Sequence, residues 1–302
     1  MHIISFVTGS SRRARVGAAI DDTYVLDFER AFDGDERPAN HVDWLDMDSA
    51  WFQQSRNLFT TLTRGSADMS RAASNGWLVK RSDVTPLAPV PRPGKIICIG
   101  LNYRDHAAEI NMAIPERPIV FSKFTTAVAA PGDAIVIPSV SRQVDYEAEL
   151  AVVIGRRAKS VSASNALDYV LGYTAFNDVT ARDFQASDGQ WQRSKSCDTF
   201  APMGPAIVTV DAIPDAQNLP IKLTLNGATM QESNTNQLIF GVPELIEFVS
   251  QSITLEPGDV IATGTPPGVG AGRKPPVFLK AGDVVEVEIE GLGRLTNVVA
   301  AD

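Results

Sequence analysis

The stretch QVDYEAELAVVIG, residues 143–155, determines how the rest of the chain is interpreted. Apolar residues occupy every second position and the run ends at a glycine, which is typical of a β-strand. The opposite face begins with three carboxylates, those of Asp145, Glu147 and Glu149. Side chains on one face of a strand repeat every ~6 to 7 Å, so two or three of these carboxylates are predicted to converge.

Converging carboxylates need a cation, because like charges raise one another's pKa and an uncompensated buried carboxylate is costly. Oxygen ligands suit Mg²⁺, Mn²⁺ or Ca²⁺, whereas zinc would favour His or Cys. A third ligand is predicted at Asp178, which follows a strand-like run that ends at Phe176. The spacing of the acids would equally fit an edge strand whose acidic face is solvated, and the pattern alone does not separate the two interpretations.

A histidine and a glutamate form a second candidate group. NYRDHAAEI, residues 102–110, places His106 and Glu109 three apart, so they share one face of a helix. The carboxylate would orient the imidazole and make it a general base near neutral pH. A surface histidine with a chance partner has the same spacing, but the other two histidines, His2 and His41, have no acidic constellation that suggests chemistry.

The segment ATGTPPGVGAG, residues 262–272, is rich in glycine and proline. Such a loop could bind an anion through its backbone N–H groups, beside the hydroxyl of Thr265. It lacks the G-K-[ST] ending of a phosphate-binding loop, so a nucleotide site is weakly supported and an ordinary turn-rich connection is the alternative. Neither G-x-S-x-G nor H-E-x-x-H occurs, so serine-hydrolase and zinc-protease interpretations have no support.

Composition restricts the possible partners and location. The 302 residues are 44% hydrophobic and 21% charged, with a net charge of -9, so we expect neither a nucleic acid nor an anionic membrane as partner. The apolar runs are far shorter than the ~20 residues that span a bilayer, and the first residues lack the order of a secretory signal. Two cysteines, Cys98 and Cys197, make no disulfide framework. We therefore expect a cytoplasmic protein.

Four prolines in TPLAPVPRPGK predict a boundary between two domains. The predicted parts are a small N-terminal domain (1–84), a linker (85–95) and a catalytic domain (96–302). Strand-like runs crowd the last part, and helical stretches are few, the best being 162–172 and 242–252, which disfavours a doubly wound parallel sheet. The predicted fold class is mixed, strand-rich α+β, with a small N-terminal α+β domain.

Seven motifs in a fixed order resemble the fumarylacetoacetate hydrolase superfamily. They span roughly residues 94–300 and read CIGLNYRDHAAE, PIVFSKF, VDYEAELAVVIG, FNDVTARDFQ, WQRSKSCDTFAPMGP, NGATMQESNTNQLIF and PGDVIATGTPPGVG. The preceding domain resembles the small N-terminal domain of two-domain bacterial members of the acylpyruvase or fumarylpyruvate hydrolase type. The resemblance implies a mixed β-roll catalytic domain, a homodimer, and Mg²⁺ or Mn²⁺ bound by three carboxylates, with Ca²⁺ possible in vitro.

The resemblance also implies roles for individual residues. The implied metal ligands are Glu147, Glu149 and Asp178. The implied catalytic residues are His106 and Glu109, on a lid-like segment, and Lys195. The implied substrate-binding residues are Arg104, Lys123, Gln185 and Thr265. Cys197 and Phe200 depart from the family pattern after the lysine, so we expect the pocket shape to differ.

The function that these residues predict is metal-dependent hydrolysis of a carbon–carbon bond. The substrate would be an acylpyruvate-type 2,4-dioxo acid, with His106 activating water and a 2-oxo acid as product. The alternatives are decarboxylation or isomerisation of a related oxo acid, of the oxaloacetate or hydroxymuconate type, and a sugar-acid hydrolase or lyase. A non-catalytic, metal-stabilised binding protein is the alternative of another class.

Overall fold

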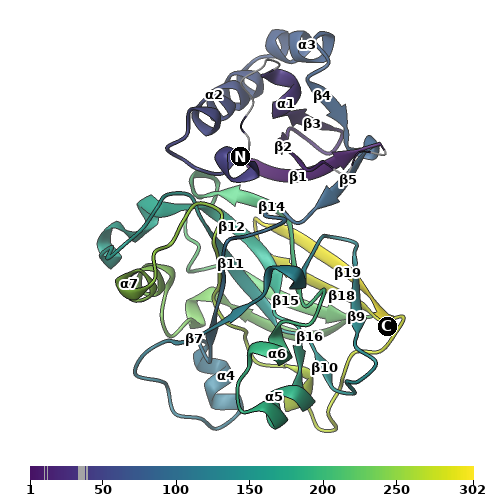
Figure 1. Cartoon of the computed structure of the whole chain (residues 1–302), viewed down its shortest axis with the longest axis vertical. Coiled ribbons are helices and arrows are strands. Elements are labelled where there is room, and N and C mark those ends of the chain that lie inside the picture. The colour runs from purple at the N-terminus through teal and green to yellow at the C-terminus, as the bar shows by residue number, and fades with distance from the viewer. Residues whose placement is uncertain (10, 12, 33–37, 39) are drawn as a thin grey trace.

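The computed structural model describes residues 1–9, 11, 13–32, 38 and 40–302 (Figure 1). In Figure 1 the first strands and helices form a smaller upper part, and the remaining elements form a larger lower part. The fold is mixed α+β and rich in strands, as predicted. None of the described helices is long and apolar enough to cross a membrane.

A mixed sheet runs through both parts of the described chain. Its strand order is β4-β3-β2-β1-β14-β12-β11-β17-β6-β7, with β5 paired to β1 and β8 paired to β14. In that order the bounds are Leu78–Lys80, Tyr24–Asp27, Arg15–Ala19, His2–Thr8, Ala201–Thr209, Val170–Asn177, Ala148–Ile154, Val260–Ala262, Ile96–Gly100 and Ile119–Lys123, with β5 at Val84–Leu87 and β8 at Val128–Ala129.

The pairing of β1 with β14 joins the N-terminal strands to the rest of the sheet, antiparallel and with Ile3 opposite Ile207. Strand β5 takes up the start of the proline-rich segment and pairs with β1, so that part of the predicted linker is regular structure. The boundaries at residues 84 and 95 stay a prediction.

Two smaller sheets complete the larger part. The order of the five-stranded sheet is β16-β15-β18-β19-β9, and β10 pairs with β13. The bounds are Ala228–Asn234, Pro220–Leu225, Val284–Ile289, Gly293–Ala301 and Ala134–Ile137 for the first, and Val144–Asp145 and Thr180–Ala181 for the pair.

Helices are short and few in the larger part. The α-helices are α1 Phe28–Ala31, α2 Ala50–Arg64, α3 Ser66–Ser74, α4 Arg104–Glu109, α5 Arg182–Asp188, α6 Gln192–Lys195 and α7 Val242–Ser252. The 3₁₀ turns are His41–Trp44, Arg81–Asp83, Thr125–Ala127, Ala163–Tyr169, Val210–Ala212, Thr235–Gln237 and Gly270–Gly272. The prediction of a helix at 242–252 is confirmed, and a proline at its start suits the first turn.

The prediction of a helix at 162–172 is wrong. The segment forms a 3₁₀ turn, Ala163–Tyr169, and then enters β12 at Val170. Gly172 lies inside that strand, where a Cβ would come 2.2 Å from the carbonyl oxygen of Val208 on β14. Strand pairing with β11 and β14 therefore overrides the local helical pattern.

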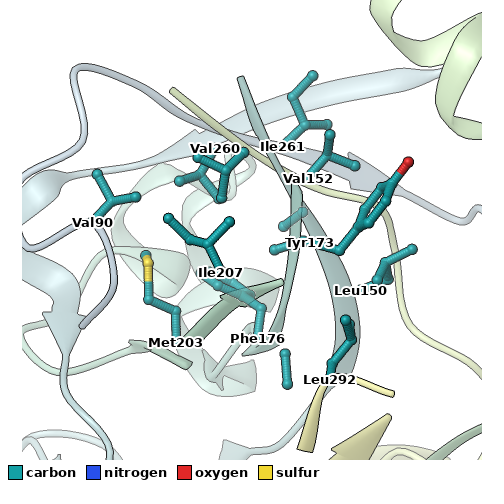
Figure 2. Close-up of a cluster of buried hydrophobic side chains, with 14 of the residues drawn as sticks. Val90, Leu150, Val152, Tyr173, Phe176, Met203, Ile207, Val260, Ile261 and Leu292 are labelled. Carbon is teal, nitrogen blue, oxygen red and sulfur yellow. The ribbon is translucent and has the colours of Figure 1, made fainter. Parts of the chain in front are cut away.

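The core surrounds the strand that the quoted stretch forms. Strand β11 lies between β12 and β17, and all seven of its residues are buried. Figure 2 shows Leu150 and Val152 of β11 among side chains of β12, β14 and β17. A strand that pairs along both edges and is buried on both faces is a central strand, so the interpretation as a solvated edge strand is wrong. The carboxylate of Glu149 therefore enters the interior of the protein.

Candidate metal and oxo-acid site

Three buried carboxylates converge at the ends of two neighbouring strands. One ligand atom from each of Glu147, Glu149 and Asp178 lies within 4.8 Å of the others. Register explains the meeting, because Ala148 of β11 faces Asn177 of β12, so the residues beside them are also adjacent. The backbone N–H of Asp178 donates to the carbonyl oxygen of Glu147 at 2.9 Å, which fixes the junction.

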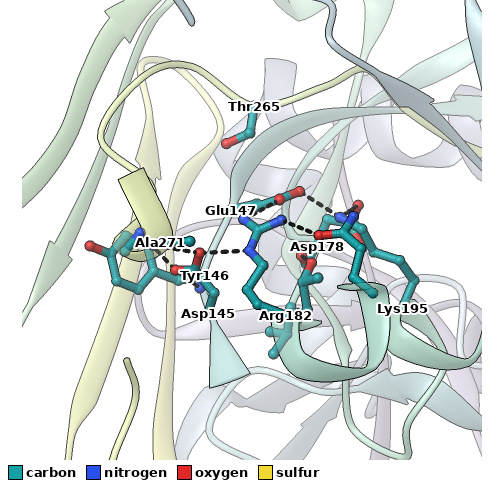
Figure 3. A network of polar contacts seen from close by, with 12 residues as sticks. Asp145, Tyr146, Glu147, Asp178, Arg182, Lys195, Thr265 and Ala271 are labelled. Atoms are coloured by element: carbon teal, nitrogen blue, oxygen red, sulfur yellow. Dashed lines mark hydrogen bonds and ion pairs between the residues drawn. The ribbon is translucent and has the colours of Figure 1, made fainter. Parts of the chain in front are cut away.

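The predicted continuous strand is interrupted, and Asp145 is consequently not part of this cluster. Strand β10 ends at Asp145 and pairs with β13, whereas β11 begins at Ala148. Asp145 is fully buried and accepts a hydrogen bond from Nε of Arg182 at 2.8 Å (Figure 3). The backbone N–H groups of Gly270 and Ala271 also donate to it, at 2.7 and 3.0 Å.

Positively charged side chains neutralise two of the three converging acids. The ammonium of Lys195 lies 2.7 Å from both Glu147 and Asp178, and Lys123 donates to the other oxygen of Asp178. Nη2 of Arg182 donates to Glu147 at 2.6 Å. Burial alone would raise the pKa of Glu147, but Lys195 and Arg182 outweigh it and lower that pKa to about 2.

Glu149 is the acid that lacks a cationic partner in the described chain. Its one hydrogen-bond donor among the described residues is the backbone N–H of Gly264, at 2.8 Å. Burial first, and then the charges of Asp178 and Glu147, raise the pKa of Glu149 well above its usual value. A divalent cation would supply the missing charge, and carboxylate oxygens are the ligands that Mg²⁺ and Mn²⁺ prefer. The donor set therefore fits such an ion.

The glycine-rich loop binds anions through its backbone, and those anions are the protein's own carboxylates. Besides the contacts of Gly264 with Glu149 and of Gly270 with Asp145, the N–H of Gly268 donates to Glu109 at 3.0 Å. Gly268 has a φ of +99°, and a Cβ there would lie 2.1 Å from the carbonyl oxygen of Met230. Glycine is required at this position for both reasons. The loop thus joins three acids of the site.

His106 and Glu109 are paired on helix α4. Nδ1 of the imidazole lies 2.9 Å from Oε2 of Glu109. A carboxylate only accepts, so Nδ1 carries the proton and Nε2 is the nitrogen that can exchange one with a substrate. The other oxygen of Glu109 is held by Gly268, so the pair is fixed to the loop as well as to α4.

A cavity of about 240 Å³ brings these groups together. The polar lining comprises His106, Glu147, Glu149, Arg182, Gln185, Lys195 and Thr265. The apolar lining comprises Ile99, Gly100, Leu101, Ile110, Met112, Ile119, Phe121 and Trp191. Six of the ten residues predicted from the sequence therefore face one space.

The other four predicted residues lie outside the lining. Lys123 and Asp178 form a buried ion pair, and Asp178 contacts Lys195. Glu109 accepts a hydrogen bond from Nδ1 of His106 and does not itself line the cavity. Arg104 is exposed and donates to the carbonyl oxygen of Leu238, so nothing in the geometry brings it to the cavity.

Two further residues, Arg182 and Trp191, contribute to the site without having been predicted, and Asp145 contributes in another role than the one predicted. Arg182 lines the cavity and contacts Asp145, Glu147 and Gln185; its signal was its place in the motif FNDVTARDFQ, three residues before Gln185. Asp145 anchors Arg182, and no local spacing indicated that role. Trp191 lies against β6 and β7, which only the tertiary structure reveals.

The larger part of the chain is strand-rich, and it carries three buried carboxylates and a histidine paired with a glutamate. The chain belongs to the fumarylacetoacetate hydrolase family, because the pattern of the fumarylacetoacetate (FAA) hydrolase C-terminal region matches residues 95–300. The predicted family and fold are thus confirmed.

Two curated relatives are oxaloacetate tautomerases. The chain is 51% identical to oxaloacetate tautomerase Fahd2a, mitochondrial, of Rattus norvegicus over 243 residues, 79% of this chain and 78% of that one. It is 44% identical to oxaloacetate tautomerase fahd2, mitochondrial, of Xenopus laevis over 301 residues, 99% of this chain and 90% of that one.

Solved structures of isomerases and hydrolases share the fold. The 5-carboxymethyl-2-hydroxymuconate delta-isomerase from Mycobacterium smegmatis is 33% identical, with a TM-score of 0.77 over 100% of both chains. The maleylpyruvate hydrolase from Sphingobium sp. SYK-6 is 30% identical, with a TM-score of 0.79 over 100% of both chains. These two neighbours represent an isomerase and a hydrolase, which are two of the reaction classes that the sequence left open.

Proposed function

We propose that this protein interconverts the enol and keto forms of a small 2-oxo acid of the oxaloacetate type, with Mg²⁺ or Mn²⁺ at the three carboxylates. The observation that carries the proposal is that His106, backed by Glu109, lines the same cavity as Glu147 and Glu149. Similarity to the oxaloacetate tautomerases favours isomerisation over the carbon–carbon hydrolysis predicted from the motifs.

The metal ligands are Glu147, Glu149 and Asp178. A divalent cation at this position would polarise the 2-oxo group of the substrate and stabilise negative charge on its oxygen. Lys195 holds Glu147 and Asp178 in place through its two 2.7 Å contacts. The Gly264 N–H orients Glu149, so each ligand has a fixed position before a substrate arrives.

His106 moves the proton at C3. In the direction from keto to enol, Nε2 of His106 removes a proton from C3, and the oxygen at C2 gains one from water. In the reverse direction the imidazolium returns the proton to C3 and the enol O–H proton leaves to water. Glu109 stabilises the imidazolium that forms in between, because its carboxylate accepts the Nδ1 hydrogen.

Gln185 and Thr265 present hydrogen-bond donors to the substrate. Oε1 of Gln185 accepts from Arg182 at 3.0 Å, so its amide N–H₂ remains available to the cavity. The hydroxyl oxygen of Thr265 accepts from Gln231 at 2.8 Å, which leaves the hydroxyl hydrogen free to donate. Both groups suit the carboxylate of an oxo acid.

The test follows the ketonisation of enol-oxaloacetate by ultraviolet absorbance, with metal-stripped protein before and after addition of Mg²⁺ or Mn²⁺. We expect activity only with metal. The substitution His106→Ala should lower kcat by roughly 10² or more, as loss of a general acid–base does, while Mn²⁺ still binds. The control His2→Ala should keep full activity. Turnover by metal-stripped protein, or by the His106→Ala variant at the normal rate, would sink the proposal.

A second candidate is hydrolysis of an acylpyruvate, in which the same imidazole activates water. The similarity to maleylpyruvate hydrolase over the full length of both chains supports hydrolysis as the second candidate. Release of pyruvate from acetylpyruvate or fumarylpyruvate would detect hydrolysis, and release of CO₂ from oxaloacetate would detect decarboxylation. A panel of sugar acids tests the remaining catalytic alternative. If the protein binds Mn²⁺ but turns over none of these substrates, the non-catalytic binding protein is the interpretation that stands.

Assembly and location also remain proposals. The family resemblance suggests a homodimer, which sedimentation equilibrium would detect as twice the chain mass. The cytoplasmic location expected from the composition contrasts with the mitochondrial proteins to which the chain is similar. Fractionation of cells that express the protein would separate the two locations.

A further inference from the structure

One side of the cavity is an apolar wall, defined here as Gly100, Ile119, Phe121 and Trp191. Gly100 ends β6, Ile119 and Phe121 lie on the neighbouring edge strand β7, and Trp191 directly precedes α6. All four residues line the cavity, together with the carboxylates Glu147 and Glu149. The wall borders the charged groups directly, because the ammonium of Lys195 lies 5.1 Å from the centroid of the Phe121 ring.

The wall depends on the absence of a side chain at Gly100. A Cβ at that position would lie 2.8 Å from the Trp191 ring and 3.5 Å from Ile119. The Trp191 and Phe121 rings meet edge to face, with centroids 5.2 Å apart and planes at 78°. The two rings and the bare backbone of Gly100 together form an apolar surface of the kind that binds apolar groups.

The wall is held in place before any substrate binds. The carbonyl oxygen of Trp191 accepts hydrogen bonds from the Ser194 hydroxyl at 2.7 Å and from the Lys195 N–H at 3.0 Å. The next residue, Gln192, accepts a hydrogen bond from Ser122 of β7 at 2.9 Å. Since the indole is fixed by α6 and β7 together, little ordering is needed when a ligand packs against it.

The cations that line the cavity are already paired, so they do not select a charged substituent on C3 over an apolar one. Its positively charged lining residues in the described chain are Arg182 and Lys195, and both already pair with carboxylates of the protein. His106 is paired with Glu109. The second carboxylate of oxaloacetate would therefore stay on the polar side chains Gln185 and Thr265, whereas an apolar substituent on C3 suits the wall.

We propose that the apolar wall binds an alkyl or aryl group on C3, so that the protein also isomerises 2-oxo acids with an apolar substituent at that carbon. The inference rests on the proposed function and widens its substrate class. The reaction balances as before: C3 gains a proton from His106, the enol O–H loses one to water, and no oxidant or further reactant takes part.

Phenylpyruvate is the test substrate, because its aryl group stands on C3. The ketonisation of enol-phenylpyruvate and of enol-oxaloacetate is measured with the metal-loaded protein, and the ratio of the two kcat/KM values is compared between variants. We expect Trp191→Ala to lower the phenylpyruvate-to-oxaloacetate ratio about tenfold, as loss of an aromatic contact does. Gly100→Ala should also lower this ratio, because the added methyl group would displace the indole of Trp191. Trp77→Phe, in the N-terminal part, is the matched control and should leave it unchanged.

A binding measurement covers the case in which a variant folds poorly. Phenylglyoxylate has no hydrogen on C3 and cannot isomerise, whereas pyruvate offers the same carboxylate and 2-oxo group without a ring. Phenylglyoxylate should quench tryptophan fluorescence and bind more tightly than pyruvate, and Trp191→Phe should abolish the quenching. Turnover of oxaloacetate with none of phenylpyruvate would overturn the inference alone. Absence of turnover on both substrates would overturn the proposed function. Equal binding of the two analogues would refute the inference that the apolar wall binds the substituent.

Discussion

Replacing Asp145 with asparagine should destabilise the protein severely, although the two side chains have the same shape. One oxygen of Asp145 accepts from the N–H groups of Gly270 and Tyr146, and the other accepts from Arg182 and the N–H of Ala271. An asparagine amide has one oxygen only, so in either orientation two buried donors face an N–H₂ group. The fully buried carboxylate also carries the charge that compensates Arg182.

Loss of two hydrogen bonds to a charged acceptor, with Arg182 left half-compensated, should cost about 3–5 kcal/mol in free energy of unfolding. Urea denaturation of metal-free protein, followed by far-ultraviolet circular dichroism, measures the difference. The matched control Asp188→Asn removes an exposed ion pair with Arg193 and should leave the urea midpoint unchanged. A loss below about 1 kcal/mol for Asp145→Asn would refute the reasoning.

Three further predictions concern the metal, the loop and the pH dependence of stability. Mn²⁺ at about 100 times its Kd should raise the free energy of unfolding by about 2.7 kcal/mol, and Glu149→Gln should abolish this rise in a urea titration. Gly268→Ala should destabilise by more than about 1 kcal/mol and lower kcat, because its Cβ would meet Met230, whereas Gly65→Ala, whose Cβ has only ordinary contacts, should do neither. Burial lowers the pKa of His41 below 6.5, so its neutral form is favoured in the native state; stability should be highest above about pH 6.5 and fall on acidification. Urea titrations should show a smaller fall in His41→Gln, and an equal fall in both proteins would contradict the assignment.

The convergence of the acids could be predicted because its signal is local. Glu147 and Glu149 stand two apart in a strand pattern, and Asp178 follows the next strand-like run, so register alone brings them together. The pair of His106 and Glu109 is visible at helical spacing for the same reason. Sequence pattern likewise indicated a strand-rich fold, because turn residues separate many short apolar runs.

The features that escaped prediction depend on contacts between distant segments. Asp145 was grouped with the converging acids because alternating side chains of one continuous strand would place all three acids on the same face. Nothing local indicates that the strand breaks at Tyr146 and that the part before the break pairs with β13. The 3₁₀ turn at Ala163–Tyr169 was mistaken for a helix because its pairing partners lie far away in sequence. The wall around Trp191 requires Gly100 of β6 to lie beneath an indole almost a hundred residues later.

The glycine-rich loop has a consequence for how this protein tolerates mutation. Glu149, Asp145 and Glu109 are each held by main-chain N–H groups of the loop, and every amino acid except proline supplies such a group. Most exchanges of side chain in the loop therefore keep these donors, and loss of function should concentrate where added bulk has no room. In a saturation scan, Gly268 and Gly270 should accept almost no replacement, since a Cβ would meet backbone oxygens at 2.1 and 1.9 Å. Gly272 should accept many replacements, because a Cβ there would come no nearer than 3.6 Å to a neighbouring side chain.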